Sequence, residues 1–223
     1  DGSNDYIALP GGVVNGLTDC TISIWVKLDS VSNWSRVFDF GNGPGVNMFL
    51  TPRSNTSVVR FAITTGGSGA EQRIDGKEAL QAGIWNHIVV TFSNGTGVLY
   101  INGDNVGQNT AMTLTPASMG NTINNYIGRS QYSADPLLDG IVDELRIYSQ
   151  ALSPTEVQML YSRSISSMAP LTPQGLSTEA ISSSEITISW NELSDATNYN
   201  IWRAELPEGP YAIIAGTGIA SYT

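Results

Sequence analysis

Cysteine and histidine are almost absent from this 223-residue chain, and each shortage excludes a class of site. Cys20 is the only cysteine, so no disulfide can form within the chain and no cysteine zinc site can be built. We expect Cys20 to be a small, buried apolar residue. With His87 as the only histidine, neither a Ser-His-Asp nor a Cys-His arrangement can be assembled convincingly. We therefore expect His87 to be a packed, hydrogen-bonded strand residue.

Basic residues and long apolar runs are also scarce. Ten lysines and arginines stand against twenty acidic residues, which gives a net charge of −10. No basic stripe is present to displace counterions from a phosphate backbone, so we expect no nucleic-acid partner. An anionic membrane surface would repel the chain, and no apolar run approaches the roughly 18 residues of a membrane span. Neutral polymers and cations are the partners that this composition leaves.

The first 150 residues are rich in strand and turn patterns and have no useful helical periodicity. "TISIWVKL" (21–28) alternates Ile22 and Ile24 with Ser23 and Trp25, which predicts a strand with one buried face. Trp25 faces away from the isoleucine row, and we expect it to be a packing residue. In "GVLYINGDNVG" (97–107), Asn102-Gly103 is a strong hairpin signal because both turn residues need positive φ.

A single helix is predicted to follow the strands. Ser153 is a natural N-cap, Pro154 fits the first helical position, and Glu156 completes a capping box. Residues 163–173 lose this periodicity and are predicted to be a linker, because serine and proline interrupt them. Further strand patterns follow in "SEITISW" (184–190) and "NYNIWRA" (198–204).

The segment "DGIVDELRIY" (139–148) raises a question about one carboxylate. Strict strand alternation places Asp143 in a row with Ile141, Leu145 and Ile147, which should be buried. Burying a bare carboxylate costs several kcal/mol, so such an aspartate needs a metal, a paired arginine or several backbone donors. The strand pattern alone leaves these alternatives open.

Loop aromatics supply candidate sugar-binding residues. Trp34 has only polar neighbours in "SNWSR", and Tyr132 lies in "RSQYSADP" with Arg129 and Asp135. Aromatic faces stack on the C–H groups of sugar rings, while arginines and amides bind hydroxyl groups. These four residues are the predicted carbohydrate site. The alternative is that Trp34 is an ordinary loop aromatic that folds down on the sheet.

Residues 1–162 resemble a laminin-G-like domain of the concanavalin A-like superfamily. The resemblance is carried by six segments in order: "DGSNDYIALP", "CTISIWVK", "WNHIVVTF", "GVLYINGDNVG", "NYIGRS" and "LDGIVDELRIYSQALSPTEV". It implies an all-β fold, a two-sheet antiparallel jelly-roll sandwich with a short C-terminal helix. Residues 174–223 resemble the front half of a fibronectin type III β-sandwich, and Trp190 and Trp202 would belong to its core.

The resemblance also implies a function. Similar domains are non-catalytic carbohydrate-binding modules of larger secreted polysaccharide-degrading enzymes, and a polysaccharide or glycan is the expected partner. The alternative is a structural or adhesive spacer of a bacterial surface or fibre protein. Related jelly rolls hold a structural Ca²⁺, which answers the question about Asp143: it would be the principal ligand, joined by Asp1 and, more weakly, by Asp19.

Catalysis is not expected of this domain. Endoglucanases of the superfamily carry Glu-x-Asp-x-Glu on one strand face, a spacing suited to acid and nucleophile roles. The glutamates up to residue 162 are Glu71, Glu78, Glu144 and Glu156, and none lies in that alternation. Asp39 is the only carboxylate in "RVFDFG", where such a row would lie.

Overall fold

The computed structural model describes residues 1–168, 173–183, 185–192, 199–203 and 212–223. The chain divides into two compact units, Asp1–Ser162 and Arg163–Thr223. In the described part of the chain, no helix has both the length and the apolar character needed to cross a membrane.

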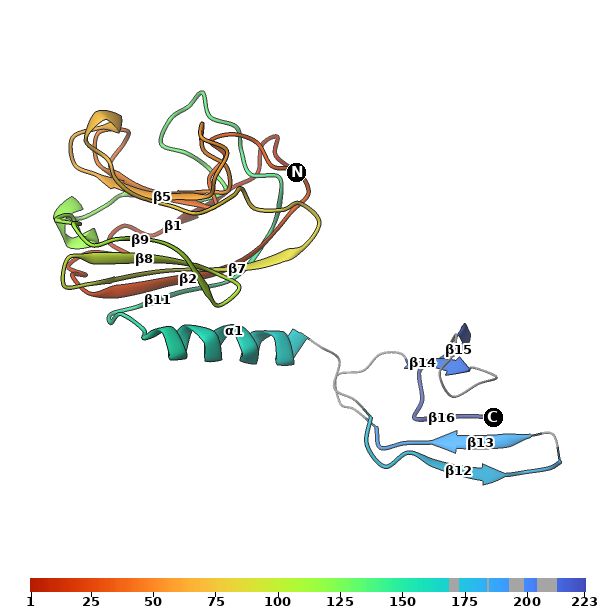
Figure 1. Cartoon of the computed structure of the whole chain (residues 1–223). Coiled ribbons are helices and arrows are strands. Elements are labelled where there is room, and N and C mark those ends of the chain that lie inside the picture. The colour runs from red at the N-terminus through yellow and green to blue at the C-terminus, as the bar shows by residue number, and fades with distance from the viewer. Residues whose placement is uncertain (169–172, 184, 193–198, 204–211) are drawn as a thin grey trace. The chain divides into compact units, whose positions relative to one another are not determined.

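Two antiparallel sheets make up the first unit (Figure 1). The six-stranded sheet has the order β1 (Ile7–Leu9), β10 (Asn124–Ile127), β3 (Phe38–Gly41), β4 (Asn47–Thr51), β5 (Arg60–Thr64) and β6 (Gln72–Asp75). The five-stranded sheet has the order β11 (Gly140–Tyr148), β2 (Cys20–Leu28), β7 (Trp85–Ser93), β8 (Thr96–Ile101) and β9 (Asp104–Asn109). Two short 3₁₀ helices, η1 (Ser68–Ala70) and η2 (Pro116–Met119), lie in the connections. The predicted all-β sandwich is confirmed.

The core lies between the two sheets and follows the predicted alternation. In β2, Ile22 and Ile24 are buried between the sheets, and Val26 and Leu28 continue the row. From the six-stranded sheet the facing residues include Phe38, Phe40, Met48, Leu50, Phe61 and Ile63. Each such side chain contributes about 1.5–3 kcal/mol through removal from water. Cys20 is buried in this core, as predicted, and burial raises the pKa of its thiol to about 12.

The β8–β9 connection is the tight hairpin that the sequence predicts. Asn102 has a φ of 53° and Gly103 a φ of 87°, so both turn residues are left-handed. The Asn102 side-chain oxygen accepts a hydrogen bond from the His87 backbone N–H at 2.8 Å. The turn is therefore anchored to the neighbouring strand β7.

Strand β11 contains a β-bulge, and this overturns the expectation that Asp143 lies in a buried row. Asp143 pairs with Trp25, but the next aligned residue, Arg146, pairs with Ser23, so β11 holds one extra residue. Glu144, with a φ of 49°, lies in this interval. The bulge reverses the alternation: Leu145 packs against the core, while Asp143 is exposed.

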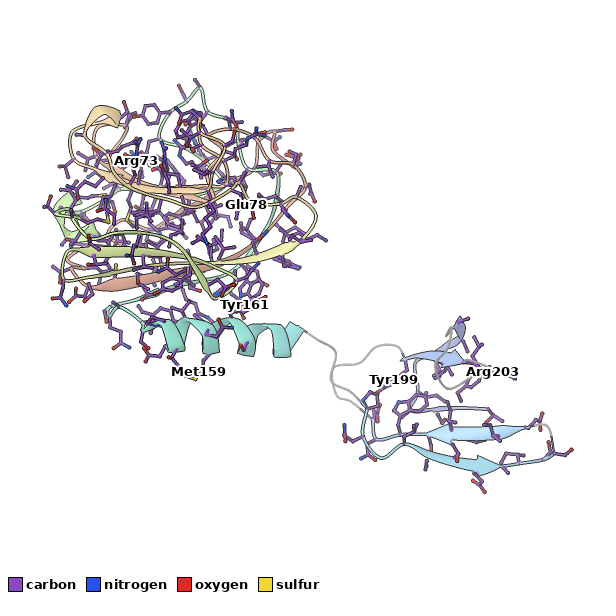
Figure 2. All side chains as sticks on the ribbon, viewed as in Figure 1. Arg73, Glu78, Met159, Tyr161, Tyr199 and Arg203 are labelled. Atoms are coloured by element: carbon purple, nitrogen blue, oxygen red, sulfur yellow. The ribbon has the colours of Figure 1, made fainter. Side chains whose placement is uncertain are left out.

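Helix α1 (Pro154–Met168) begins where the sequence predicts. The Ser153 N–H donates to Glu156 Oε2 at 2.7 Å, and the Glu156 N–H donates back to Ser153 Oγ at 3.3 Å, which confirms the capping box. Figure 2 shows Tyr161 pointing toward the sheet and Met159 away from it. The linker prediction is wrong at its start, because α1 continues to Met168. Residues 169–172, in the second half of the expected linker, lie outside the described part.

The described part of the second unit contains two small antiparallel sheets. One has the order β12 (Ser177–Ala180), β13 (Ile186–Ser189) and β16 (Ser221–Tyr222), and the other joins β14 (Tyr199–Arg203) to β15 (Ala212–Thr217). Trp190, Tyr199 and Ile201 form its buried cluster. The side chain of Trp202 lies outside the description. The fibronectin type III identity of this unit remains a prediction.

Candidate functional site

The outer face of the six-stranded sheet carries a row of residues that faces away from the core. The pairing register aligns Ala8, Tyr126, Asp39, Phe49, Ala62 and Arg73 across the six strands. Asp39 and Phe49 are buried although they point outward. The loops between the strands must therefore cover the middle of this face, and they build a site over it.

Arg36 is the centre of that site. It is 2% exposed, and its guanidinium lies 4.1 Å above the Phe49 ring. One terminal nitrogen, Nη2, lies 2.9 Å from Asp135 Oδ2, and Nε lies 3.5 Å from Asp39 Oδ2. The other terminal nitrogen donates to the Trp34 backbone carbonyl. Two carboxylates and a carbonyl thus surround one buried cation, as such a charge requires.

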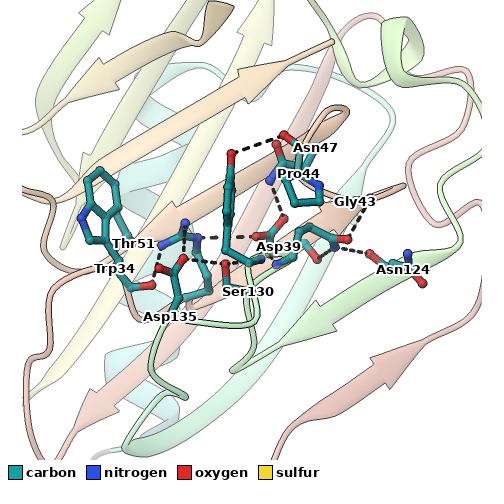
Figure 3. A network of polar contacts seen from close by, with 12 residues as sticks. Trp34, Asp39, Gly43, Pro44, Asn47, Thr51, Asn124, Ser130 and Asp135 are labelled. Carbon is teal, nitrogen blue, oxygen red and sulfur yellow. Dashed lines mark hydrogen bonds and ion pairs between the residues drawn. The ribbon is translucent and has the colours of Figure 1, made fainter. Parts of the chain in front are cut away.

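Asp39 connects this cation to the loop after β10 (Figure 3). It accepts hydrogen bonds from the Gln131 backbone N–H at 3.0 Å and from the Asn47 amide at 3.2 Å. Gln131 in turn donates to the Asn124 carbonyl at 2.7 Å. Burial raises the pKa of Asp39 to about 7, against the lowering effect of these bonds and of Arg36. The network fixes the loop that carries Tyr132 and Asp135.

Trp34 is held in an unusual backbone conformation. Its φ is 64°, a left-handed value that is rare for a bulky residue and is characteristic of functional sites. Its N–H donates to the Arg53 carbonyl at 2.9 Å, and its carbonyl accepts from Arg36. The guanidinium carbons of Arg36 and Arg60 lie 5.5 Å and 5.7 Å from the indole ring centroid. Trp34 is partly buried, so it folds toward the sheet and still reaches solvent.

These groups line one pocket of about 160 Å³. Its walls are formed by Trp34, Arg36, Ser68, Glu71, Tyr132 and Asp135. Burial raises the pKa of Glu71 above its ordinary value. The Tyr132 hydroxyl donates to the Pro44 carbonyl at 3.4 Å, and Ser130 Oγ donates to Asp135 at 2.8 Å. Aromatic faces, hydroxyls and carboxylates around a small concavity suit a ligand rich in both C–H and O–H groups.

The structure brings three of the four predicted sugar-binding residues into this pocket: Trp34, Tyr132 and Asp135. Arg129 does not line it, and its guanidinium carbon lies over the rings of Tyr6 and Tyr126. Sequence reasoning missed Arg36, Ser68 and Glu71. The one sequence signal for Arg36 is its spacing from Asp39, because these opposite charges lie three residues apart on either side of the apolar start of a strand.

The structure places two of the three predicted calcium ligands, Asp1 and Asp19, in different pockets. Asp1 lines a pocket of about 190 Å³ with Asp5 and Tyr6. Asp19 lines a different pocket and accepts a weak hydrogen bond from the Asn94 N–H at 3.4 Å. Asp143 is exposed and accepts from the adjacent Glu144 N–H at 2.7 Å. Among the described residues, no group of three or more histidine, cysteine or acidic side chains is placed to hold one ion. The calcium ion and its ligands stay a prediction.

His87 is a packed residue, as predicted. It is 1% exposed, shares a 2.8 Å hydrogen bond between Nε2 and Ser23 Oγ, and stacks on Trp25 with ring centroids 4.9 Å apart. Tyr161 of α1 stacks on both rings. Burial lowers the pKa of His87 to about 4, with Arg146 adding to the effect. Trp25 is buried in the same stack, which confirms its packing role.

Comparisons with known proteins agree with this architecture. Domain 4 of AbnA, a GH43 extracellular arabinanase from Geobacillus stearothermophilus solved with arabinotriose, is 26% identical with a TM-score of 0.60, over 70% of this chain and 72% of that one. The Ruminococcus gnavus IT-sialidase CBM40 is 16% identical with a TM-score of 0.56, over 71% of this chain and 97% of that one. At such identity the second likeness concerns the fold alone.

The same CBM40 bound to α2,3-sialyllactose is also 16% identical, with a TM-score of 0.55 over 71% and 97% of the two chains. No curated protein matches the chain. The family profile described as the concanavalin A-like lectin/glucanases superfamily matches residues 1–158, well over half of the sequence. The chain therefore belongs to the concanavalin A-like lectin/glucanase superfamily, in its laminin-G-like branch.

Proposed function

We propose that the first unit is a non-catalytic carbohydrate-binding module that holds an uncharged polysaccharide in the Trp34 pocket. One observation supports this proposal most directly. A single small pocket is lined by two aromatic side chains, Trp34 and Tyr132, and by two charged side chains, Arg36 and Asp135. The family membership and the arabinotriose complex of the similar arabinanase domain support it.

The charges of the pocket favour a neutral ligand. Arg36 is already paired with Asp39 and Asp135, so it has little capacity left for a ligand carboxylate. Glu71 and the net charge of −10 would repel an anionic polymer. Arabinan is the first candidate, with xylan, galactan and β-glucan as alternatives.

Replacement of Trp34 by alanine is expected to lower glycan affinity by about tenfold. This is the effect expected when a sugar loses one aromatic contact and the hydrogen bonds beside it are weakened. Affinity electrophoresis against arabinan, xylan, galactan and β-glucan measures the effect. Trp85→Ala is the matched control, since Trp85 is a partly exposed tryptophan on the other sheet. Melting temperatures verify folding. Failure of the wild type to bind any of the four polymers would refute the proposal.

We further propose that the module serves a larger, secreted polysaccharide-degrading enzyme and that the second unit is a fibronectin type III spacer. Glu71 and Asp135 both line the pocket, but Asp135 is engaged by Arg36 and Ser130, which disfavours a role in acid–base chemistry. Release of reducing sugar by the purified chain would contradict a non-catalytic module. Binding by neither unit would favour the structural or adhesive spacer.

A structural calcium ion is part of the same proposal, and it rests on the family resemblance. Asp1 is the first ligand candidate, in the pocket that it lines with Asp5 and with Val142, the chain neighbour of Asp143, while Asp19 lines a different pocket. If calcium binds only the folded state, raising it to 100 times its Kd should stabilise the protein by about 2.7 kcal/mol. Melting curves in chelator and in excess calcium measure this, with magnesium as the control. Coincident curves would remove calcium from the proposal.

A further inference from the structure

Arg129 is the predicted sugar-binding residue that the Trp34 pocket does not include, and its surroundings form a second feature of the same sheet face. Its guanidinium carbon lies 4.5 Å from the Tyr6 ring centroid and 5.0 Å from that of Tyr126. The two tyrosine rings meet edge to face at 5.6 Å and 88°. Three side chains from β10, the following loop and the segment before β1 thus form one compact platform.

Arg129 differs from Arg36 in its partners. Arg36 is buried and bound by two carboxylates, whereas the Arg129 side chain makes no hydrogen bond or ion pair within the described part of the chain. Its guanidinium carbon lies over the two tyrosine rings, which accept no N–H hydrogen bond from it, so its N–H groups are available as donors. Arg129 is only partly buried and Tyr6 is 45% exposed, so the donors and an aromatic surface are both accessible.

The platform and the Trp34 pocket lie on one face of the six-stranded sheet. Tyr126 is the cross-strand neighbour of Asp39, and Asp39 is the neighbour of Phe49, above which the Arg36 guanidinium lies. Two strand spacings separate Tyr126 from Phe49, about 10 Å. The loop after β10 carries Arg129 on the platform and Tyr132 in the pocket, and its Gln131 is bonded to Asp39. One extended chain of sugar units could therefore contact both.

From this arrangement, and resting on the proposed function, we propose that Tyr6, Tyr126 and Arg129 form a second subsite for an uncharged sugar unit of the glycan chain held in the Trp34 pocket. The sugar ring stacks on the exposed Tyr6 surface, and Arg129 donates to its hydroxyl oxygens. A charged unit is disfavoured, because Asp1 and Asp5 line the adjoining pocket with Tyr6 and the chain carries a net charge of −10.

The test compares ligand lengths. Affinities for arabinan polymer and for arabinan oligosaccharides of increasing length are measured by calorimetry for wild type, Tyr6→Ala, Arg129→Met, Arg73→Met and Trp34→Ala; if only another panel polymer binds, its own oligosaccharides replace arabinan. Tyr6→Ala and Arg129→Met are each expected to weaken polymer binding about tenfold, with a loss that shrinks as the ligand shortens. Arg73→Met removes an exposed arginine from the same cross-strand row and is the matched control, expected to bind like wild type.

The outcomes separate the two proposals. If Trp34→Ala loses affinity while Tyr6→Ala and Arg129→Met bind all lengths like wild type, the second subsite is refuted and the pocket stands. If the wild type binds no panel polymer, the proposed function fails and the subsite fails with it. Tighter binding of polygalacturonate than of any neutral polymer would overturn the choice of an uncharged ligand. Melting temperatures confirm that each variant is folded.

Discussion

Replacement of Arg36 by methionine is expected to destabilise the first unit by about 3–5 kcal/mol, since removing one partner of a buried ion pair leaves a charge uncompensated. Two carboxylates lose their cation: Asp39, which is fully buried, and Asp135 at 2.9 Å. The methionine chain can still cover Phe49, so lost packing is a minor part of the loss. Urea denaturation of both proteins measures the difference.

The destabilisation caused by Arg36→Met should also depend on pH. Burial raises the pKa of Asp39 from 3.8 to about 7, so the folded state disfavours its ionised form. The contribution of the protonated Asp39 carboxyl to folding stability is complete below its unfolded pKa and is lost as pH rises through the folded pKa of about 7. Without Arg36 the folded pKa rises further, and the loss extends to higher pH. The deficit of the variant should therefore be larger at pH 8 than at pH 5.

Two further variants control this result. Arg73→Met removes an arginine that is 57% exposed and should cost less than about 1 kcal/mol. Arg36→Met combined with Asp39→Asn should be more stable at pH 8 than Arg36→Met alone, because the buried carboxylate is gone. Equal losses for Arg36→Met and Arg73→Met, or a loss independent of pH, would contradict the account of the site.

Local sequence patterns predicted much of the fold, because these elements are specified by neighbouring residues. The alternation in β2 gave its buried row, Asn102-Gly103 gave the β8–β9 turn, and Ser153 with Glu156 gave the start of α1. Each of these predictions depends on a hydrophobic periodicity, a turn signal or a capping signal that spans only a few residues. The same local reasoning ended α1 too early, since serine and proline content did not reveal a helix that continues to Met168.

The error at Asp143 has a specific physical cause. Counting by twos assumes an uninterrupted strand, and one extra residue transfers every later side chain to the opposite face. Glu144 occupies the left-handed conformation in that stretch, but it is not a glycine or an asparagine, so no residue type signalled the bulge. The supposed buried carboxylate, which motivated the calcium prediction, is an exposed one.

The site could be predicted only in part, because two kinds of residue form it. Trp34 and Tyr132 are aromatics in polar loops, which single residues reveal. Arg36, near the start of β3, and Glu71, in a later loop, come together only because β3, β4 and β5 pair in one sheet. Single residues do not reveal that pairing. Arg129 is close to Tyr132 in sequence but turns to the other side of the loop, toward Tyr6.

Protonation of His87 is expected to lower the free energy of unfolding of the first unit by about 3 kcal/mol. Its pKa falls from 6.5 to about 4 because burial disfavours the charged ring, and Arg146 adds to this. A folded pKa below the unfolded value means that the stabilisation is full above pH 6.5 and is lost as pH falls to 4. This free-energy difference follows from the fall of the pKa from 6.5 to about 4, at about 1.36 kcal/mol for each pKa unit.

His87→Phe isolates this contribution, since phenylalanine can occupy the place of the imidazole beside Trp25 and Tyr161 without titrating. Ser23 loses its partner, a cost of about 1 kcal/mol that applies at every pH, and Ser23→Ala in the same chain relieves it. The carboxylates are the same in both proteins, so the difference in unfolding free energy between pH 7 and pH 4 reports His87. Because it is the only histidine, one NMR ring resonance gives the midpoint directly. A midpoint near 6.5, or parallel stability curves for the two proteins, would show that the ring is not buried as the structure has it.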